Sequence, residues 1–399
     1  MRPVADPIPF EEALALILAR TPVLAAERVP LAVAAGRVLV EPAAAAVDLP
    51  PFASSAMDGF AVRSEDTPGT LPVSYRIAAG SPSPRPLEAG EAMGIATGGV
   101  VPAGADAVVP HEYVVQHDNS VEIGERVAAG ANVRPRGGDV SVGDVVAEAR
   151  TRLRAGQLGA LAASGVAEVV CARRPRAAVL TTGSELRRPG EPLAPGEVYE
   201  ANGVMLAAQL EAAGAEVERL EAVADDAEAH RRAIERGLEF DVLVTSGGVS
   251  VGPHDLVRRV EAELGVEEVF WRVSIRPGKP VSFGLRGETL VFGLPGNPVS
   301  SLVGCELFVR PALLALQGAA DPGPAFLPGR LTRAVRRGAR DEFVRARAEA
   351  GFEGVLLDPI TGQDSHMIVR AAAADALVHV PSGDGELAAG ASVRYLALS

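Results

Sequence analysis

The chain has few cysteines, few aromatic residues and no long apolar run. Its two cysteines, Cys171 and Cys305, lie far apart and form no CxxC or Cys/His spacing, which excludes a disulfide framework and argues against a zinc site. Aromatic residues make up 4% of the sequence, which leaves little for base-stacking surfaces. No stretch approaches the ~20 apolar residues of a membrane span, and the N-terminus lacks the apolar core of a secretory signal. We therefore expect a cytoplasmic protein without a membrane segment.

Basic residues are outnumbered as well. Lys and Arg total 38 against 51 Asp and Glu, which gives a net charge of −13. This balance argues against broad binding to nucleic acid or to an anionic membrane. An acidic chain that binds an anion must do so locally, through a few cations or a bridging metal.

The residues that are present suit a large globular protein. Hydrophobic residues make up 48% of the 399 positions, and this length predicts roughly two to four domains. The 43 glycines and 31 prolines indicate many turns and β-rich parts.

Short strands separated by Pro and Gly clusters predict a compact β-rich module within residues 71–150. These strands are expected at residues 73–79, 92–96, 107–115 and 121–123. One helix is predicted over residues 10–20 and another within residues 151–170. After a linker at residues 320–328, further short strands predict a small β-barrel or sandwich.

From residue 176 the predicted strands and helices alternate. Strands are expected at 177–181, 217–223 and 240–246, helices at 227–238 and 255–264, and Asn202 would cap a further helix. This β-α-β-α-β order predicts a parallel, doubly wound sheet covered by helices. Strands at 281–285 and 290–294 then lead into a helix that ends near residue 316.

The stretch VTSGGVSVGPHD at residues 244–255 joins a buried strand to a helix through a glycine-rich turn. Glycines let backbone N–H groups approach a ligand, and the start of a helix adds partial positive charge. The turn therefore predicts an anion cradle, with Asp255 placed to hold a cation beside it. Taken alone, the stretch is as readily a structural turn.

Glu185, Asp225 and Asp255 each follow the carboxyl end of a predicted strand. Ligands of open α/β sheets bind outside those ends. One acid at such a position is commonplace as a helix cap, but three in succession favour a shared site.

Other polar turns are candidates, each with a structural alternative. Asp58 lies in an Asp-Gly turn and is either the cap of a hairpin or a presented carboxylate. Thr97 precedes two glycines, and Asp139 ends RPRGGD, which is otherwise a solvated charged turn. His366 is either a packed or surface histidine or a ligand contact.

Arg276 and Lys279 flank a Pro-Gly turn in IRPGKP. No structural role for them is evident from the sequence, so they are the best candidates for anion contacts in that segment. The following PGNPVSS places Asn297 at a helix N-cap and Pro298 at the first helical position, so much of this motif is local helix chemistry.

The motifs SSAMDGFA, ATGG, RGGD, TTGSEL, TSGGVSVGPHD, RPGKP and PGNPVSS follow one another in this order. Together they closely resemble the molybdopterin molybdenumtransferase family, the last-step molybdenum insertases that are related to the E domain of gephyrin. The resemblance runs from about residue 7 to the C-terminus.

The resemblance implies four parts. These are an elongated N-terminal domain (1–46 and 140–175), an inserted β-rich domain (47–139), an α/β molybdopterin-binding domain (176–320) and a C-terminal β-barrel (326–399). It also implies a homodimer with active sites between subunits, and the adenylyltransferase of the preceding step as a partner. The implied reaction places molybdate on the dithiolene of molybdopterin, with Mg2+-dependent cleavage of adenylyl-molybdopterin and release of AMP.

The resemblance assigns site residues motif by motif. The implied catalytic residues are Asp58, Thr97, Asp139, Glu185, Asp225 (or Asp226) and Asp255. Glu185, Asp225 and Asp255 would hold Mg2+, which takes oxygen ligands and keeps several waters. The implied substrate-binding residues are Ser246, Gly247, Gly248, Ser250, Gly252, Arg276, Lys279, Pro295, Asn297, Ser300, Arg345, Ser365 and His366. Among them, the cations would attract molybdate, and the glycines and serines would cradle the pterin and its phosphate.

The chain departs from the family pattern in two places that bear on the site. Arg276 stands where Lys is usual, which keeps the charge but changes the contact geometry. Ser365 and His366 lie in GQDSHM, the looser match. The sequence leaves open whether water or molybdate attacks. It also leaves two alternatives, a molybdopterin-binding carrier, which would need no trio of strand-end acids, and the adenylyltransferase, which resembles the α/β domain alone.

Overall fold

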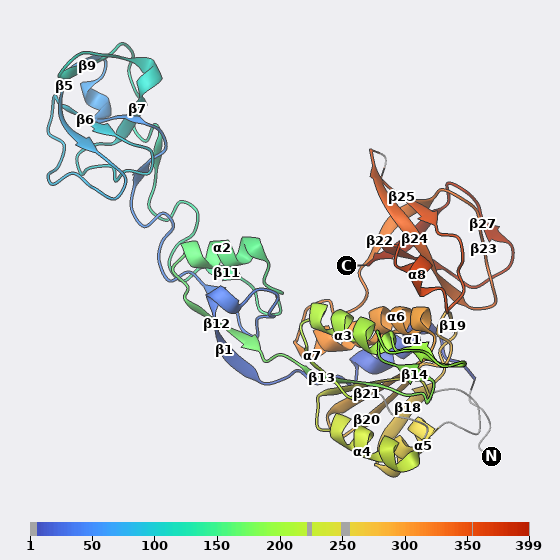
Figure 1. The fold of residues 1–399 in the computed structure, drawn as a ribbon. Helices are drawn as coiled ribbons and strands as arrows, with labels where there is room; N and C mark the ends of the chain where they lie inside the picture. Colours follow the sequence, from blue (N-terminus) through green and yellow to red (C-terminus); the bar gives the residue numbers. More distant parts are fainter. Residues whose placement is uncertain (1–5, 222–225, 249–255, 353, 399) are drawn as a thin grey trace. The chain divides into compact units, whose positions relative to one another are not determined.

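The structure, a computed structural model, describes residues 6–221, 226–248, 256–352 and 354–398 (Figure 1). The chain forms two compact units. One unit consists of Met1–Glu27, Gly36–Val40 and Cys171–Ser399, and the other of Arg28–Ala35 and Glu41–Val170. The chain crosses between the units four times: within β1 (Ala26–Pro30), between Ala35 and Gly36, between Val40 and Glu41, and within β12 (Glu168–Ala172).

The second unit contains the β-rich module that the sequence predicts. A six-stranded sheet has the order β7-β4-β6-β5-β9-β8, and all its neighbouring pairs are antiparallel except β5 and β6. Its strands are β4 (Gly59–Val62), β5 (Gly69–Ile77), β6 (Ala92–Ile95), β7 (Ala107–Pro110), β8 (Val114–Gln116) and β9 (Ser120–Ile123). The prediction of a single strand over residues 107–115 was wrong. A 3₁₀ turn, η3 (His111–Tyr113), divides it directly after Pro110, whose ring removes a backbone donor that a continuous strand would use.

Short elements complete this unit. Strand β3 (Ser54–Ser55) pairs with β10 (Val133–Arg134), and β2 (Ala43–Ala44) pairs with β11 (Val145–Ala147). The 3₁₀ turns are η1 (Leu31–Val33) and η2 (Ser64–Asp66). Helix α2 (Ala155–Ala163) is shorter than the 151–170 window in which a helix was predicted. Gly165, with φ +83°, follows its end, as is common where a helix terminates.

The first unit contains the predicted doubly wound sheet, of order β16-β13-β17-β21-β20-β18. The strands are β13 (Arg176–Thr181), β16 (Glu216–Arg219), β17 (Val242–Ser246), β18 (Glu267–Trp271), β20 (Ser282–Arg286) and β21 (Thr289–Leu294). The pairs among β16, β13, β17 and β21 are parallel, and β20 and β18 extend the sheet antiparallel. The parallel arrangement brings the carboxyl ends of β13, β17 and β21 to one edge.

Alternating residues of the buried strands serve two separate cores. In β17, Val242 and Val244 join the core under α1 (Phe10–Leu18), α3 (Asn202–Ala212) and the helices after β21, whereas Leu243 joins the core under α4 (Ala227–Gly237) and α5 (Leu256–Glu263). Figure 1 shows α4 and α5 on one face of the sheet and α3 on the other. Because both faces are covered, the central strands β13, β17 and β21 are largely apolar, as the sequence indicated, whereas the edge strand β16 is mostly exposed.

The helix predicted from Pro298 to about residue 316 is continuous but not uniform. It consists of α6 (Pro298–Gly304), a π-helical turn (Cys305–Val309) and α7 (Arg310–Leu316). Pro311 lacks the N–H that an unbroken α-helix would use, and the wider turn immediately before it accommodates the break. By length and composition this is the one helix among the described residues that is apolar enough to cross a membrane, which is weak evidence because it is mostly buried inside the protein.

The C-terminal part is a closed five-stranded barrel, which decides between the predicted barrel and sandwich. Its order is β24-β25-β22-β28-β26, and β24 also pairs with β26 to close it. The strands are β22 (Phe326–Leu331), β24 (Asp341–Gly351), β25 (Gly354–Pro359), β26 (Ala376–Val380) and β28 (Ser392–Ala397). Strand β19 (Ile275–Arg276), from the α/β part, adds parallel to β24. The remaining elements are α8 (Ile368–Ala371) and the pairs β14 (Leu186–Arg187) with β15 (Val198–Tyr199) and β23 (Val335–Arg336) with β27 (Glu386–Leu387).

Candidate functional site

A cavity of about 610 Å³ lies at the carboxyl ends of β13, β17 and β21, where an open α/β sheet is expected to bind its ligand. We call it the strand-end cavity. Its lining residues come from the ends of these strands, the β14–β15 pair, the start of α3 and the start of α6: Thr181, Thr182, Glu185, Leu186, Val198, Tyr199, Glu200, Ala201, Asn202, Ser246, Gly296, Asn297, Pro298 and, from the segment before α8, His366. Four of the residues predicted to form the site, Glu185, Ser246, Asn297 and His366, thus share one cavity.

Ser246, the last residue of β17, is buried in a hydrogen-bond network at the cavity wall. Its Oγ accepts a hydrogen bond from Asn202 Nδ2 at 2.9 Å and donates one to the backbone oxygen of Pro295 at 3.2 Å. The hydroxyl of Ser301, in α6, donates to the same Pro295 oxygen. This network joins the start of α3, the end of β17 and the loop before α6.

Gly247 and Gly248 follow β17 with φ of +97° and +66°, which glycine adopts without strain. A Cβ at Gly247 would lie 2.6 Å from the backbone oxygen of Thr182, and a Cβ at Gly248 would lie 2.4 Å from Cγ2 of Val257. Both positions therefore favour glycine, because a Cβ would collide with the Thr182 backbone at one and with the Val257 side chain at the other. Ser250, Gly252 and Asp255, the rest of the predicted cradle, lie outside the described residues.

Asn202 corrects one sequence expectation. It is the first residue of α3 rather than its N-cap, and the side chain makes no capping bond. Its Nδ2 instead donates to Ser246 Oγ and to the backbone oxygen of Gly296, which fixes the orientation of the amide. Its Oδ1 is buried without a hydrogen-bond partner. The sequence carries no signal that marks Asn202 as a site residue, because its partners are distant in sequence.

Glu185 is the described member of the predicted acid trio, and its exposed carboxylate lines the strand-end cavity. Asp225 and Asp255 lie outside the described residues. Asp226, the alternative to Asp225, caps α4, where its Oδ2 accepts the backbone N–H of Ala229 at 2.8 Å. Among the described residues, no group of three His, Cys, Asp or Glu side chains is placed to hold a metal ion.

Arg345 is a fully buried cation in β24, with 0% of its surface exposed. Its Nη2 donates to the backbone oxygen of Gly362 at 3.1 Å, whereas Nε and Nη1 have no hydrogen-bond partner. Burial lowers the pKa of Arg345, neighbouring Asp364 acts to raise it, and neighbouring Arg276 lowers it further. Unpaired buried donors are costly, so this guanidinium retains unused capacity to donate to an oxygen ligand.

Arg276 and Arg345 are close enough to interact electrostatically, and we call them the arginine pair. Arg276 is exposed and, contrary to the expectation that it has no structural role, its Nη1 pairs with Glu342 Oε1 at 3.2 Å. Lys279, half-buried, lies in the same loop, whose Gly278 packs against the backbone of Ser300 in α6.

The loop that follows Arg276 and the segment that carries Ser365 both contact the start of α6. The backbone oxygen of Ser365 accepts the N–H of Val299 at 3.1 Å, which seats the segment before α8 on that helix. Ser365 is adjacent in sequence to His366, which lines the cavity. The predicted residues of RPGKP, PGNPVSS and GQDSHM are thus brought together in space.

In the second unit, the motifs that carry Asp58, Thr97 and Asp139 converge around β3. Asp58 Oδ1 accepts the backbone N–H of Thr97 at 2.7 Å. This bond, together with the Thr97 hydroxyl and the positive influence of His111, lowers the pKa of Asp58. Asp139 is exposed, and its N–H donates to the backbone oxygen of Leu49 at 2.9 Å.

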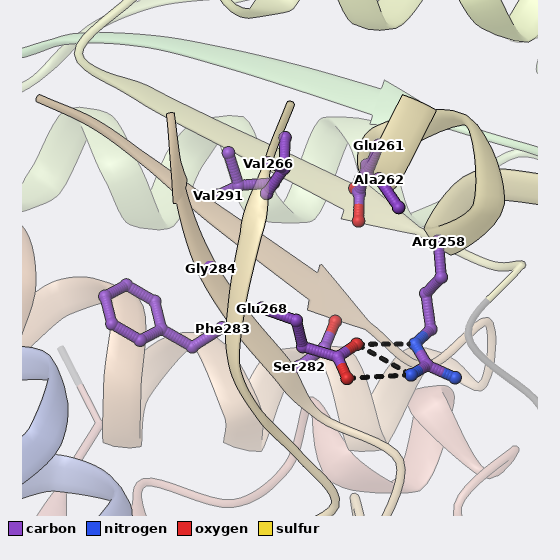
Figure 2. Close-up of a pocket in the computed structure, with 9 residues that line it drawn as sticks. All are labelled: Arg258, Glu261, Ala262, Val266, Glu268, Ser282, Phe283, Gly284 and Val291. Atoms are coloured by element: carbon purple, nitrogen blue, oxygen red, sulfur yellow. Dashed lines mark hydrogen bonds and ion pairs between the residues drawn. The ribbon is translucent and has the colours of Figure 1, made fainter. Parts of the chain in front are cut away.

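A separate cavity of about 340 Å³, between α5 and the β18–β20 edge, is a poorer candidate (Figure 2). Its Arg258 points at Glu268 and binds both carboxylate oxygens, at 2.7 to 2.9 Å. The Arg258 guanidinium also stacks 4.0 Å from the ring centroid of Trp271. Its charge is therefore neutralised within the protein, and none of the predicted site residues lines this cavity.

Comparison with known proteins covers almost the whole chain. Residues 8–165 match the family described as MoeA N-terminal region (domain I and II), residues 178–315 the probable molybdopterin binding domain, and residues 328–398 the MoeA C-terminal region (domain IV). The molybdopterin molybdenumtransferase 2 of Mycobacterium tuberculosis (strain ATCC 25618 / H37Rv) is 36% identical over 388 residues, which cover 92% of this chain and 93% of that protein.

Two further relatives agree with this match. The molybdopterin molybdenumtransferase of Staphylococcus aureus (strain MRSA252) is 32% identical over 400 residues, 98% of this chain and 96% of that protein. The crystal structure of the molybdopterin biosynthesis moeA protein from Pyrococcus horikoshii OT3 superposes with a TM-score of 0.84 at 29% identity, and covers 98% of this chain and 100% of that one. The likeness therefore extends to all parts of the fold.

Proposed function

This chain belongs to the molybdopterin molybdenumtransferase family, and from that membership we propose that it carries out the last step of molybdenum cofactor biosynthesis. In that step molybdate enters the dithiolene of molybdopterin, adenylyl-molybdopterin is cleaved in a Mg2+-dependent reaction, and AMP leaves. The observation that supports this most directly is a buried guanidinium with unpartnered donors, Arg345, which binds the backbone of Gly362 in the segment that leads to His366 at the strand-end cavity.

Arg345 is the proposed centre of molybdate binding. Molybdate is a tetrahedral dianion, and its oxygens would accept from Nε and Nη1, the donors that lack a partner. Charge-assisted hydrogen bonds of this kind are roughly twice as strong as neutral ones. Arg276, Lys279, Ser300 and Ser365 would complete the binding site from the segments that meet at α6.

The strand-end cavity is the proposed site of the pterin and its phosphate. Gly247 and Gly248 adopt positive φ directly after β17, and the backbone N–H of Gly248 would contact the phosphate. Ser246 and Asn297 would supply polar contacts, together with the backbone of Pro295 and with His366. Ser250 and Gly252 remain proposed members of the cradle.

The donor chemistry of the strand-end cavity fits Mg2+. The described side chains that line it offer mainly oxygen atoms, from Glu185, Glu200, Thr181, Thr182 and hydroxyl or amide neighbours. Glu185 would hold the ion together with the substrate phosphates, with Asp225 and Asp255 as further proposed ligands, because Mg2+ typically uses one or two carboxylates. When bound, Mg2+ would offset the charge of the pyrophosphate and polarise its phosphorus.

Residues of the second unit would complete the site in a homodimer. Asp58, Thr97 and Asp139 are exposed, and we propose that a second copy of the chain presents them to the cleft. Asp58 would act as a carboxylate, because its pKa is lowered by Thr97. The adenylyltransferase of the preceding step is the proposed supplier of the substrate.

Incubation of the purified protein with adenylyl-molybdopterin, Mg2+ and molybdate tests the function, with release of AMP as the readout. AMP should appear with the complete mixture and should fall when molybdate or Mg2+ is left out. The variant Glu185→Gln should lose AMP release, whereas Glu288→Gln, an exposed glutamate at the opposite end of the sheet, should retain it. Binding of the substrate without any release of AMP would instead indicate a carrier.

A further inference from the structure

His379, in β26, is a buried histidine that the proposed function does not use. Its side chain is 3% exposed. Its Nδ1 lies 3.0 Å from Nη2 of Arg394, in β28, and its Nε2 lies 3.1 Å from Oδ2 of Asp341, at the start of β24. A guanidinium can only donate, so Nδ1 accepts, and Nε2 carries the proton that is donated to Asp341. His379 is therefore a neutral imidazole whose two hydrogen bonds connect three strands of the barrel.

Aromatic rings fix the orientation of this imidazole. It is stacked on Phe343, with centroids 5.2 Å apart and an interplanar angle of 21°. The ring of Phe326 lies 5.9 Å from it, and that of Phe10, from α1, lies 6.4 Å from it. His379 thus lies where the barrel packs against α1. Because the stacking sets the plane of the imidazole, its Nε2–H stays directed at Asp341.

Asp341 lies where the barrel pairs with β19, the strand that carries Arg276. The parallel register places Asp341 beside Ile275 and Glu342 beside Arg276. The two residues that flank Asp341 bind the same strand. Arg340 Nη1 donates to the backbone oxygen of Ile275 at 2.9 Å. Glu342 pairs with Arg276 at 3.2 Å, so the start of β24 fixes the position of Arg276.

Strand β24 also carries Arg345, further along from Asp341. Successive side chains of a strand point to opposite faces, so Asp341, Phe343 and Arg345 share one face. Phe343 and Arg345 are both buried. A displacement of the start of β24 therefore moves both members of the arginine pair, Arg345 directly and Arg276 through β19.

We propose that His379 is a positioning residue for the arginine pair, an inference that rests on the proposed function. It contacts no substrate. Its Nε2–H binds one oxygen of the Asp341 carboxylate, and the other oxygen accepts the N–H of Ser382 at 2.8 Å. These two bonds hold the start of β24 in register with β19. Without the bond from His379, the two cations lose the fixed spacing from which both would bind one molybdate.

Three substitutions separate the two bonds of His379 from the bulk of its ring. His379→Gln keeps a donor near the position of Nε2 but no acceptor at Nδ1. His379→Asn keeps an acceptor near Nδ1 but no donor that reaches Asp341. His379→Phe keeps a ring among the aromatic neighbours and removes both bonds.

His230→Gln is the matched control for the loss of a buried histidine. His230 is 1% exposed, and its Nδ1 bonds to the backbone oxygen of Asp226 at 2.8 Å. It belongs to α4, which covers the face of the sheet opposite to α1. Its replacement therefore perturbs the fold away from the barrel.

Molybdate binding is measured by calorimetry, kcat and the KM for molybdate by AMP release, and Tm without ligand, all on full-length proteins. We expect His379→Asn and His379→Phe to raise the Kd and the KM for molybdate by about tenfold and to leave kcat within about twofold, because only binding is lost. His379→Gln should stay within about twofold of wild type in Kd. His230→Gln should lower Tm and leave the Kd for molybdate unchanged.

The inference is overturned if His379→Phe binds molybdate as wild type does, or if His379→Gln is impaired as strongly as His379→Asn. It is also overturned if the loss of binding follows the loss of Tm equally in the His379 and His230 variants, because the histidine then serves packing alone. In each of these cases wild type still binds molybdate and releases AMP. If wild type does neither, the proposed function fails and the inference fails with it.

Discussion

Replacement of Arg345 by methionine should make the ligand-free protein more stable while it removes the response to molybdate. Two donors of Arg345, Nε and Nη1, are buried without partners, and each such group costs about 1–3 kcal/mol. Methionine keeps a straight side chain of similar volume and carries no donors. The variant loses the bond from Nη2 to Gly362, which leaves a carbonyl with a penalty of about 1–3 kcal/mol. The net change is a gain of roughly 1–3 kcal/mol in the free energy of unfolding.

Thermal unfolding with and without molybdate measures both effects. A gain of 1 kcal/mol in the free energy of unfolding raises Tm by about 2–4 °C in a domain of roughly 150–250 residues. Wild type should gain a further ~2.7 kcal/mol when molybdate is present at about 100 times its Kd, because only the folded state binds it. The variant Arg345→Met should show no such gain. Arg347→Met is the matched control, because Arg347 lies in the same strand with an exposed side chain, and it should behave as wild type.

The reasoning is refuted by either of two results. If Arg345→Met is less stable than wild type without molybdate, while Arg347→Met is not, the guanidinium is part of the barrel's own structure rather than held for a ligand. If Arg345→Met keeps the molybdate-dependent rise in Tm, the oxyanion binds elsewhere.

Two further predictions concern other parts of the chain. Asn202→Ala should lower the free energy of unfolding by about 2 kcal/mol in urea titrations, because Ser246 Oγ and the Gly296 carbonyl both lose their donor, which outweighs removal of the unpartnered Oδ1. It should also weaken pterin binding, because Asn202 lines the strand-end cavity. Unchanged stability would contradict the network at Ser246. Arg85→Gln should raise the pKa of Glu91, which the hydrogen bond from Arg85 holds at about 2, toward 4.5, as followed by NMR titration. A carboxyl whose pKa is lower in the folded than in the unfolded state stabilises the fold at pH values above its unfolded pKa. Wild type should therefore be more stable than the variant above pH ~4.5 and should lose that advantage as the pH falls toward ~2. Equal stability of the two proteins at neutral pH would argue against a stabilising role for the Arg85–Glu91 pair.

The sequence predicted the elements whose signals are local. The apolar β-branched run that became β17 and the glycine pair after it were found correctly, because burial on both faces and positive φ leave direct marks on residue type. The amphipathic period of α4 gave its bounds to within a residue. The division of the strand predicted at 107–115 was missed, although Pro110 marks it.

The sequence could not predict features that depend on distant partners. Asn202 was interpreted as a helix cap because its residue type favours that role, whereas its actual partners, Ser246 and Gly296, lie far along the chain. The pairing of Arg276 with Glu342 arises only when β19 joins β24 of the barrel. The burial of Arg345 likewise has no local signal, since the same residue type on a strand is usually exposed.

An acidic protein that must bind an oxyanion gains from keeping its key cation buried. Exposed cations attract anions over a Debye length of about 8 Å at physiological ionic strength, and both salt and the surrounding carboxylates weaken that attraction. In this chain Glu342 already pairs with the exposed Arg276, whereas the buried Arg345 keeps two donors unpaired, with Asp364 as a nearby counter-charge. Burial thus separates two tasks that a basic surface would combine. The net charge of −13 discourages non-specific polyanions, and in the proposed function the single buried guanidinium of Arg345 would select a small oxyanion by its unfilled hydrogen bonds.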